Sequence, residues 1–510
     1  METELKFVID AKGAARLRAD LGLPDEGERL RSVYFDTPHL DLKSAGFVLR
    51  VREEDGRRVQ TIKQANGSLF TRHEWETCLS QDQAAADEPA RDGLDFAAID
   101  ETPLGACLGA RRRKALAPVF EVDVRRAKSQ IEFAGAQIEA ALDEGEVRTV
   151  GHRTPIRELE LELKSGHPAA LFALARTLKD AALTLSFLTK SARGFALARD
   201  GAVYAAALAP PPLKGDQSAA DGLRAVAAAC LAQIAAHAEI LRLREDSEAI
   251  HQLRVGARRL RSTLSLFRAL MSDEERERVS DELRWLARSC DGARDLDVFI
   301  KSRFAPMMAA ETRPERLAAF AAVLEQRRAR AHDQARQTVA SPRFRGLLLE
   351  TAAWIEGGEW TRDNARAVQR DKPLKTFAAK VLDQADHRVA KRAKALKSPD
   401  DRPRHRLRVA DKTLRFAASV LSPAFEDADP ARIKAFGKAA TKAQNALGAV
   451  TDIVSARALC SQIAEDEGRS DPDIAFAAGY VAGQIAASGP EKLKAARKAV
   501  RALRKAEPFW

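Results

Sequence analysis

Cysteine is scarce in this chain of 510 residues, and its five cysteines lie far apart. No two of them form a CxxC pair, so the spacing indicates neither a disulfide framework nor a zinc site. This usage is typical of a reducing compartment, and we expect a cytoplasmic protein. The five residues are Cys78, Cys107, Cys230, Cys290 and Cys460.

Long hydrophobic runs are also missing. The chain starts directly with charged residues, without the apolar core of a signal peptide. No uninterrupted apolar run approaches the ~20 residues that a membrane-spanning helix needs. We therefore expect no membrane partner.

Aromatic residues make up only 6% of the chain, so stacking platforms for nucleic-acid bases are scarce. The charge balance, by contrast, is basic, with 84 Lys and Arg against 73 Asp and Glu. An excess of +11 favours anionic partners, which include nucleic acid, membrane surfaces and polyphosphate. Because aromatic residues are few, we expect no nucleic-acid partner.

The sequence has two textures. Up to about Tyr204, short runs alternate between apolar and polar residues, which predicts antiparallel strands. Helical spacing at 12–21 and 168–182 accompanies them. The expected strands are 2–9, 47–52, 57–64, 70–79, 119–126, 129–133, 137–142 and 156–164.

Residues 209–218, APPPLKGDQS, break any regular element with three prolines and a glycine. Beyond them, Ala-, Leu- and Arg-rich stretches with three-to-four spacing predict helices. We therefore expect a strand domain at 1–206, a linker at 207–218 and an all-helical domain at 219–510.

The helical part repeats itself. HQLRVGARRLR at 251–261 is answered by HRLRVADKTLR at 405–415, an offset of 154. CDGARDLDV at 290–298 is answered by LGAVTDIV at 447–454, an offset of 157. Two pseudo-symmetric helical bundles, at about 219–360 and 370–510, follow from these repeats.

The strands carry their charges on one face. Glu2, Glu4 and Lys6 alternate with apolar or small residues, and the same spacing recurs in the strands that follow. Such a pattern permits a sheet with a solvated outer face or a barrel with a charged lumen. Recurrence over five strands favours the lumen. The other charges on these faces are Arg50, Arg52, Lys63, Arg72, Glu74, Glu76, Glu121, Asp123, Arg125, Glu158, Glu160, Glu162 and Lys164.

Several motifs resemble the CYTH, or triphosphate tunnel metalloenzyme, family. They are ExExK at 2–6, YFDTPHLDL at 34–42, LRVR at 49–52, TIK at 61–63 and ELELELK at 158–164. The resemblance covers about 1–204 and implies an eight-stranded antiparallel tunnel that hydrolyses triphosphates with Mg²⁺ or Mn²⁺. The usual Ser-Lys of the family reads Thr189-Lys190 here.

The resemblance also implies roles for individual residues. Catalytic roles fall to Glu2, Glu4, Lys6 and Glu160. Glu2, Glu4, Glu158, Glu160 and Glu162 would bind the metal, since carboxylates are hard oxygen ligands. Lys6, Arg50, Arg52, Lys63, Arg72, Arg125 and Lys190 would bind the triphosphate. Asp143 is a further matching acid.

Each helical repeat places a histidine and three basic residues on one helix face and its leucines on the other. Carboxylates such as Asp295, Asp297 and Asp452 could neutralise such a stripe, or an external polyanion could. Between 388 and 415 the chain has 11 Lys or Arg against 3 Asp, which favours the polyanion. The stripes are His251, Arg254, Arg258 and Arg261, and His405, Arg408, Lys412 and Arg415.

These repeats and the closing PFW resemble the CHAD domain, a histidine-containing helical domain that often follows a CYTH domain. At Asp291 the family pattern would have a glycine, as at Gly448. The resemblance implies that inorganic polyphosphate binds along a basic groove between the bundles, which would place the protein at polyphosphate granules. Arg388 and Lys391 join the two stripes as candidate polyphosphate-binding residues.

We therefore expect a metal-dependent inorganic triphosphatase that cleaves triphosphate to diphosphate and phosphate, with polyphosphate bound by the helical domain. One alternative is a catalytically weak or silent protein that only binds polyphosphate. Another is a tunnel enzyme that acts on a different triphosphate, such as thiamine triphosphate.

Overall fold

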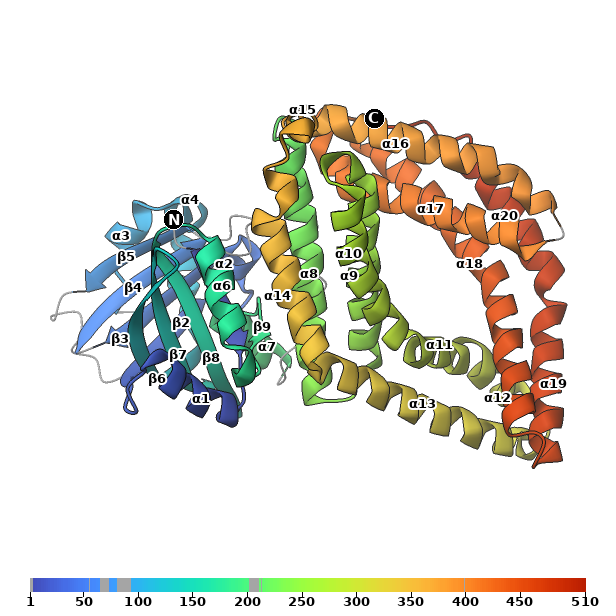
Figure 1. Cartoon of the computed structure of the whole chain (residues 1–510), viewed down its shortest axis with the longest axis horizontal. Helices are drawn as coiled ribbons and strands as arrows, with labels where there is room; N and C mark the ends of the chain where they lie inside the picture. The colour runs from blue at the N-terminus through green and yellow to red at the C-terminus, as the bar shows by residue number, and fades with distance from the viewer. Residues whose placement is uncertain are drawn as a thin grey trace. The chain divides into compact units, whose positions relative to one another are not determined.

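The computed structural model in Figure 1 describes residues 3–54, 56–64, 73–79, 93–200, 211, 213–398 and 400–510. Glu2 and Arg72 therefore lie outside the described residues. By its internal contacts the chain forms two compact units. Unit 1 comprises Met1–Ala209, Leu231–Arg244 and Ala340–Gly357, and unit 2 comprises Pro210–Cys230, Glu245–Val339 and Gly358–Trp510.

Unit 1 is built on one antiparallel sheet of nine strands in the order β5-β4-β3-β2-β6-β7-β8-β1-β9. The resemblance implied eight strands, and the short β9 is the addition. The bounds are β1 Thr3–Val8, β2 Glu28–Asp36, β3 Phe47–Glu54, β4 Arg57–Gln64, β5 His73–Leu79, β6 Ala117–Phe133, β7 Ala136–Thr149, β8 His152–Ser165 and β9 Thr184–Leu185.

Several strands differ from the prediction: β9 was not expected, and β7 extends to Thr149 instead of ending at 142. β2 was not expected, although Leu30, Ser32 and Tyr34 form a buried alternate face in it. β6 joins the two strands expected at 119–126 and 129–133, because the residues between them continue to pair with β7. Thus Ala127 pairs with Leu142 and Lys128 with Ala141 across the expected break.

Helices cover part of the outer face of the sheet. Phe47, Leu49 and Val51 of β3 pack with Ile62 of β4 into a buried cluster under short helices. Those helices are α2 Asp41–Ser44, α3 Phe96–Asp100 and α4 Pro103–Cys107, followed by α5 Ala110–Ala115. The odd-numbered residues of β3 are thus used for packing, and its arginines face the other way.

α7, Lys190–Asp200, packs on the inner face of the sheet, where Phe195 and Leu197 join Phe120, Val122 and Val124 of β6 in one buried cluster. Phe195 meets Phe120 edge to face, with ring centroids 5.0 Å apart. An apolar plug therefore fills one part of the inner face and leaves the rest to charged residues.

Two expected helices of unit 1 are present. α1, Ala11–Leu21, begins at Asp10, whose carboxylate accepts a hydrogen bond from Gly13 N. α6, Ala169–Thr177, is shorter than the helix expected at 168–182, because the chain continues as a 3₁₀ turn at Lys179–Ala181.

Segments that follow the predicted linker also belong to unit 1. They are the second half of α8 (Ala219–Leu243) and nearly all of α14 (Pro342–Gly357). Arg176 of α6 pairs with Glu350 of α14 at 2.7 Å, and Arg242 of α8 donates to Thr184 Oγ1 at 2.9 Å. By length and composition α8 could cross a membrane, but 78% of its apolar window is buried inside the protein, as in a core helix.

Unit 2 is helical, and α16, α17, α18 and α20 lie side by side in it (Figure 1). Its two repeats share a core in which Phe320 and Leu324 of the first pack with Ile463 and Val481 of the second. The bounds are α9 Ser247–Leu266, α10 Asp273–Ser289, α11 Asp291–Phe299, α12 Ala305–Ala310, α13 Ala318–Ala340, α15 Ala367–Arg370, α16 Leu374–Arg392, α17 Asp401–Leu421, α18 Pro430–Asp466, α19 Pro472–Ala487 and α20 Gly489–Leu503.

The two stripes lie on α9 and α17, and the apolar sides of these helices are buried as predicted. Leu253, Ala257 and Leu260 of α9 are inaccessible to solvent, and so are Leu407 and Leu414 of α17. Asp411 is an exception, because this carboxyl group of α17 is also fully buried. The first repeat has Ala257 at the equivalent position, 154 residues earlier.

The buried Asp411 is expected to destabilise unit 2 at neutral pH. Neither of its oxygens has a hydrogen-bond partner among the described residues, and burial raises its pKa to about 7, although Arg415 opposes this. An acid whose pKa is higher in the folded than in the unfolded state costs stability as the pH rises between the two values.

We predict that Asp411→Ala raises the free energy of unfolding at pH 8 by up to about 4 kcal/mol. The gain should shrink as the pH falls below 7 and be less than about 1 kcal/mol at pH 4, because the two states differ in ionisation mainly between the two pKa values. Denaturant melts at pH 4 to 8 measure this. The cavity left by the substitution shifts all values alike, so a gain independent of pH would contradict the prediction.

Candidate functional site

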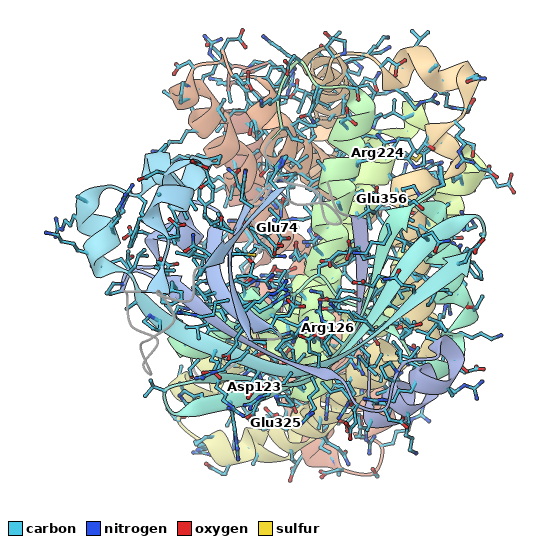
Figure 2. All side chains as sticks on the ribbon, turned by 90° about the vertical axis from the view of Figure 1, so that its left-hand side faces the viewer. Glu74, Asp123, Arg126, Arg224, Glu325 and Glu356 are labelled. Atoms are coloured by element: carbon cyan, nitrogen blue, oxygen red, sulfur yellow. The ribbon has the colours of Figure 1, made fainter. Side chains whose placement is uncertain are left out.

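The inner face of the sheet borders an open cavity of about 740 Å³, and most of the side chains that line it are charged. Figure 2 looks toward this part of the chain and labels Glu74 and Arg126, which belong to different walls of the sheet. The described lining includes the cations Lys6, Arg50, Arg52, Lys63, Arg126, Lys128, Lys164 and Lys190, and the carboxylates Glu4, Glu54, Glu74, Glu76, Glu139, Glu160 and Glu162.

One wall is a network of ion pairs centred on Lys190, the first residue of α7. Its Nζ lies 2.7 Å from Asp143 Oδ2, 3.0 Å from Glu158 Oε2 and 2.8 Å from Glu160 Oε1. Lys6 of β1 and Arg126 of β6 add further bonds to Glu160, at 2.8 and 2.6 Å. β7 and β8 are thus joined at the ammonium group of Lys190, and β1 and β6 are joined to them through Glu160.

This network keeps its carboxyl groups ionised although they are buried. Burial alone would raise the pKa of Glu160, but Lys190, Lys6 and Arg126 outweigh it and hold the pKa well below its usual value. The pKa of Asp143 is lowered in the same way by Lys190 and Arg126 against the effect of burial. The pKa of Lys190 is raised well above normal, because its three carboxylates outweigh its burial.

The opposite wall, from β3, β4 and β5, has three cations and three carboxylates in the described lining, but only the pair of Lys63 and Glu74 is short, and the pairs of Arg50 and Arg52 span 3.5 to 4.0 Å. Burial, then Arg50 and Arg126, lower the pKa of Arg52, and burial, then Arg50, lower the pKa of Lys63 in spite of Glu74. Lys63 Nζ lies 2.7 Å from Glu74, whereas Arg50 is 3.5 Å from the same carboxylate. The buried Nε atoms of Arg50 and Arg52 have no hydrogen-bond partner in the described part of the chain. An anion would satisfy these donors.

Tyr34 connects this wall to the apolar plug. Its ring stacks on Phe120 with centroids 4.4 Å apart, and the side chain is buried beside the cavity. Burial alone would raise the pKa of the phenol, but Arg50 and Arg52 outweigh it and lower the pKa. The hydroxyl group therefore lies in the cationic part of the cavity.

The structure brings most of the sequence-predicted tunnel residues to this cavity. Glu4, Lys6, Arg50, Arg52, Lys63, Glu160, Glu162 and Lys190 line it. Glu158 lies deeper, 1% exposed, and bonds to Lys190 and Arg193 behind the lining. Their chemical roles stay predictions.

The prediction for Arg125 is wrong, because this residue is exposed on the outer face of β6. Glu121 and Asp123 share that face and pair with Arg31 and Arg29 of β2. On β6 the inward residues are Phe120, Val122 and Val124, which pack against α7, followed by Arg126. Charge alone therefore misidentified the inner face of this strand.

Sequence reasoning missed other residues of the cavity. Arg126, Lys128, Glu54, Glu139 and Lys164 line it without having been proposed for a role in the site. The alternation of β6 could have revealed Arg126, because it continues the buried series 120, 122 and 124. Arg193 was also missed, four residues before α7 reaches Leu197, and it bonds to Glu158 at 3.1 Å.

The donor set fits a hard divalent cation in its chemistry. Glu4, Glu160 and Glu162 present carboxylate oxygens to the same cavity, and such oxygens are the ligands of Mg²⁺ and Mn²⁺. In the described residues no three acidic, histidine or cysteine side chains form a ready-made metal cluster. Lys6, Lys190 and Arg126 hold Glu160 instead.

A second candidate site lies in unit 2, where the two stripes converge. Arg254 and Arg408, equivalent by the offset of 154, each meet a carboxylate: Arg254 is 2.6 Å from Asp291, and Arg408 is 3.9 Å from Asp452. Arg258 and Lys412, equivalent in the same way, have mainly cations around them. Neighbouring carboxylates thus neutralise the stripes only in part.

Burial and repulsion between neighbouring cations lower the pKa values of Arg258 and Lys412. Burial, then Arg254, Arg415, Arg259 and Arg408, lower the pKa of Arg258 to about 10, although its side chain still reaches solvent. Burial, then Arg408 and Arg258, lower the pKa of Lys412 to about 8. We name Arg254, Arg258, Arg408 and Lys412 the basic groove.

Other residues predicted for polyphosphate have different surroundings. Burial and Arg294 lower the pKa of His251, so the imidazolium form expected there is disfavoured in the free protein. Arg261 faces Arg284 and Arg288 of α10, and Arg415 Nε bonds to Gln444. His405 is exposed beside a small pocket formed with Val450 and Val454. No described interaction joins Arg388 or Lys391 to the basic groove.

Comparison with known proteins identifies a domain in each part of the chain. A model of the CYTH domain matches residues 1–195, and a model of the CHAD domain matches residues 225–461. The inorganic triphosphatase of Haemophilus influenzae is 28% identical over 205 residues, which are 38% of this chain and 54% of that protein. The chain thus spans about half the length of this relative.

Among solved structures, the CHAD domain from the plant Ricinus communis is similar with 28% sequence identity and a TM-score of 0.50. The match covers 59% of this chain and 97% of that domain. One chain thus contains an antiparallel sheet with a charged inner face and a helical repeat with paired basic stripes. The chain therefore has a CYTH domain in its N-terminal part and a CHAD domain in its C-terminal part.

Proposed function

We propose that the protein is a metal-dependent inorganic triphosphatase, which hydrolyses tripolyphosphate to diphosphate and phosphate in the cavity of unit 1. The observation that carries this proposal is the division of one cavity into two walls, with ionised carboxylates on β8 and, on β3, arginines that are loosely paired and have unsatisfied donors. The similarity to the inorganic triphosphatase of Haemophilus influenzae supports the reaction class.

The walls match the charge of the substrate. Tripolyphosphate carries several negative charges, so an attacking water is repelled until the phosphoryl oxygens are neutralised. Arg50, Arg52 and Lys63 would hold those oxygens, because their donors and charges lack full compensation. Tyr34 would donate a hydrogen bond next to them.

The carboxylate wall would hold Mg²⁺ or Mn²⁺ through Glu4, Glu160 and Glu162. Such an ion, when bound, neutralises charge on the phosphoryl oxygens and orients them. Glu4 has no ion pair with any described residue, so it is the carboxylate best able to orient a water and accept its proton. The bond between the terminal phosphorus and the bridging oxygen then breaks, and diphosphate leaves.

The lining favours an inorganic substrate over a nucleotide. Tyr34 is the only aromatic residue among the described residues of the lining, and its ring is already stacked on Phe120. A nucleobase or thiazole ring would therefore lack an aromatic surface in the described part of the cavity. A substrate panel of tripolyphosphate, ATP and thiamine triphosphate with Mg²⁺ and Mn²⁺ tests this preference.

For unit 2 we propose binding of inorganic polyphosphate at the basic groove. A chain of phosphates at regular spacing would neutralise Arg258 and Lys412, whose mutual repulsion Asp452 relieves only in part. The similarity of this part to CHAD domains is consistent with this. Binding would localise the protein at polyphosphate granules in the cytoplasm.

The tunnel proposal predicts that Glu4→Gln lowers kcat for tripolyphosphate by at least about a hundredfold, since the variant loses a metal ligand and the proton acceptor. Phosphate release with Mg²⁺ and with Mn²⁺ measures the effect. Glu121→Gln is the matched control, because Glu121 lies on the outer face of β6, and it should change kcat less than twofold. Wild-type protein that releases no phosphate with either metal would disprove the proposal.

The groove proposal predicts that Arg258→Ala with Lys412→Ala weakens binding of long-chain polyphosphate by about tenfold or more, because two cations of the groove are lost. Tripolyphosphate turnover should not change. The double variant Arg388→Ala with Lys391→Ala removes the same charge outside the groove and should have a smaller effect. Isothermal titration calorimetry at fixed salt concentration compares the three proteins, and equal losses in both variants would contradict the assignment.

Polyphosphate binding should also depend on pH through Lys412. Its pKa of about 8 means that the free groove loses one charge between pH 7 and 9, and a bound polyanion favours the protonated form. Affinity should therefore fall over this range, and binding at pH 8.5 should take up protons. Lys412→Arg keeps its charge at pH 9, so an equally steep fall in that variant would exclude Lys412 as the cause.

A further inference from the structure

Glu239 of α8 is a buried carboxylate that has no place in the mechanism above. It lies in the segment matched by the CHAD model, but in unit 1 by its contacts. Its side chain is 12% exposed and pairs with Arg193 of α7. Ser186 Oγ, which follows β9, donates to the same carboxylate at 3.1 Å.

Arg193 connects Glu239 to the tunnel network. Its guanidinium group is shared between Glu239 and Glu158, and Glu158 in turn bonds to Lys190. Opposed only by burial, these two carboxylates raise the pKa of Arg193 above its usual value. A continuous series of ion pairs thus leads from α8 to the cavity lining.

A second connection passes through Ser186. Its backbone N–H donates to the carbonyl oxygen of Lys6 at 2.9 Å, while its hydroxyl group donates to Glu239. Lys6 is the β1 residue that bonds to Glu160. Glu239 therefore contacts the carboxylate wall by two routes: through Arg193, which bonds to Glu158, and through Ser186, which bonds to Lys6.

The charges of the network balance only when Glu239 is included. The four cations Lys6, Arg126, Lys190 and Arg193 face the three tunnel carboxylates Asp143, Glu158 and Glu160. The fourth carboxylate comes from α8. An uncompensated charge at this depth is costly, so the network would rearrange without Glu239.

We propose that Glu239 is a positioning residue of the tunnel: a side chain from the region matched to CHAD compensates Arg193, so that Glu158 keeps its bond to Lys190 behind the lining and Glu160 remains available to the divalent cation. This inference builds on the proposed triphosphatase function. Without Glu239, Glu158 is the one remaining carboxylate among the described residues that pairs with Arg193, and the net charge of the wall becomes more positive by one. Such a charge opposes binding of a metal cation but not of the anionic substrate.

The opposite signs of these effects make the test specific. In full-length protein, Glu239→Gln and Glu239→Ala should weaken Mn²⁺ binding by about tenfold, whereas metal-free tripolyphosphate should bind as well as to wild type or more tightly. Calorimetry measures both affinities. In phosphate-release assays the Mn²⁺ concentration for half-maximal rate should rise by a similar factor. General damage to the fold would instead weaken the binding of both ligands.

Glu350→Ala is the matched control, because it breaks another ion pair within unit 1, with Arg176, that has no described bond to the tunnel network. It should leave Mn²⁺ binding unchanged. Thermal melts verify that each variant is folded, and the Gln variant keeps the shape of the side chain if the Ala variant is unstable.

Unchanged Mn²⁺ affinity in a folded Glu239→Gln protein would overturn the inference. If both Glu239 variants bind Mn²⁺ and tripolyphosphate more weakly by the same factor, the inference is overturned as well. If wild-type protein binds Mn²⁺ and tripolyphosphate but releases no phosphate, the triphosphatase proposal fails, and the two binding affinities still decide the role of Glu239.

Discussion

The ammonium group of Lys190 holds unit 1 together at its functional centre. It bonds to three carboxylates from β7 and β8, while Lys6 and Arg126 bring β1 and β6 to the same group of acids. Removing any one partner would leave a buried charge without compensation. The position of α7, the ionisation of the acids and the polarity of the cavity all depend on this network.

The two candidate sites differ in how far neighbouring side chains compensate their charges. In the carboxylate wall, internal cations compensate Glu160, so a divalent cation would compete with Lys190, Lys6 and Arg126 for this carboxylate. In the basic groove, compensation is incomplete, and the lowered pKa values of Arg258 and Lys412 record the repulsion that remains. The first arrangement is suited to exchanging one cation for another, and the second to taking up an anion.

Local patterns predicted much of this architecture. Glu158, Glu160 and Glu162 alternate with three leucines, so their common face was evident, and the buried leucines of α9 and α17 followed from helical spacing. The prediction for β6 failed because an alternation with a period of two residues identifies the two faces of a strand but does not say which face points inward. Its apolar face packs on α7, a contact set by residues about 75 positions later in the chain. The convergence of the stripes and the bond from Arg193 to Glu239 are likewise non-local.

The order of the strands has a mechanical consequence. β5 and β9 end the sheet, and no backbone ladder between them is present in the described ranges, which omit 65–72 and 80–92. In a fully closed barrel, strand number and shear fix the diameter. Here the attraction between Lys63 of β4 and Glu4 of β1 acts between the two halves of the sheet. Within the described ranges, side-chain charges rather than a closed backbone ladder thus link these halves, and dissolved ions weaken such attraction.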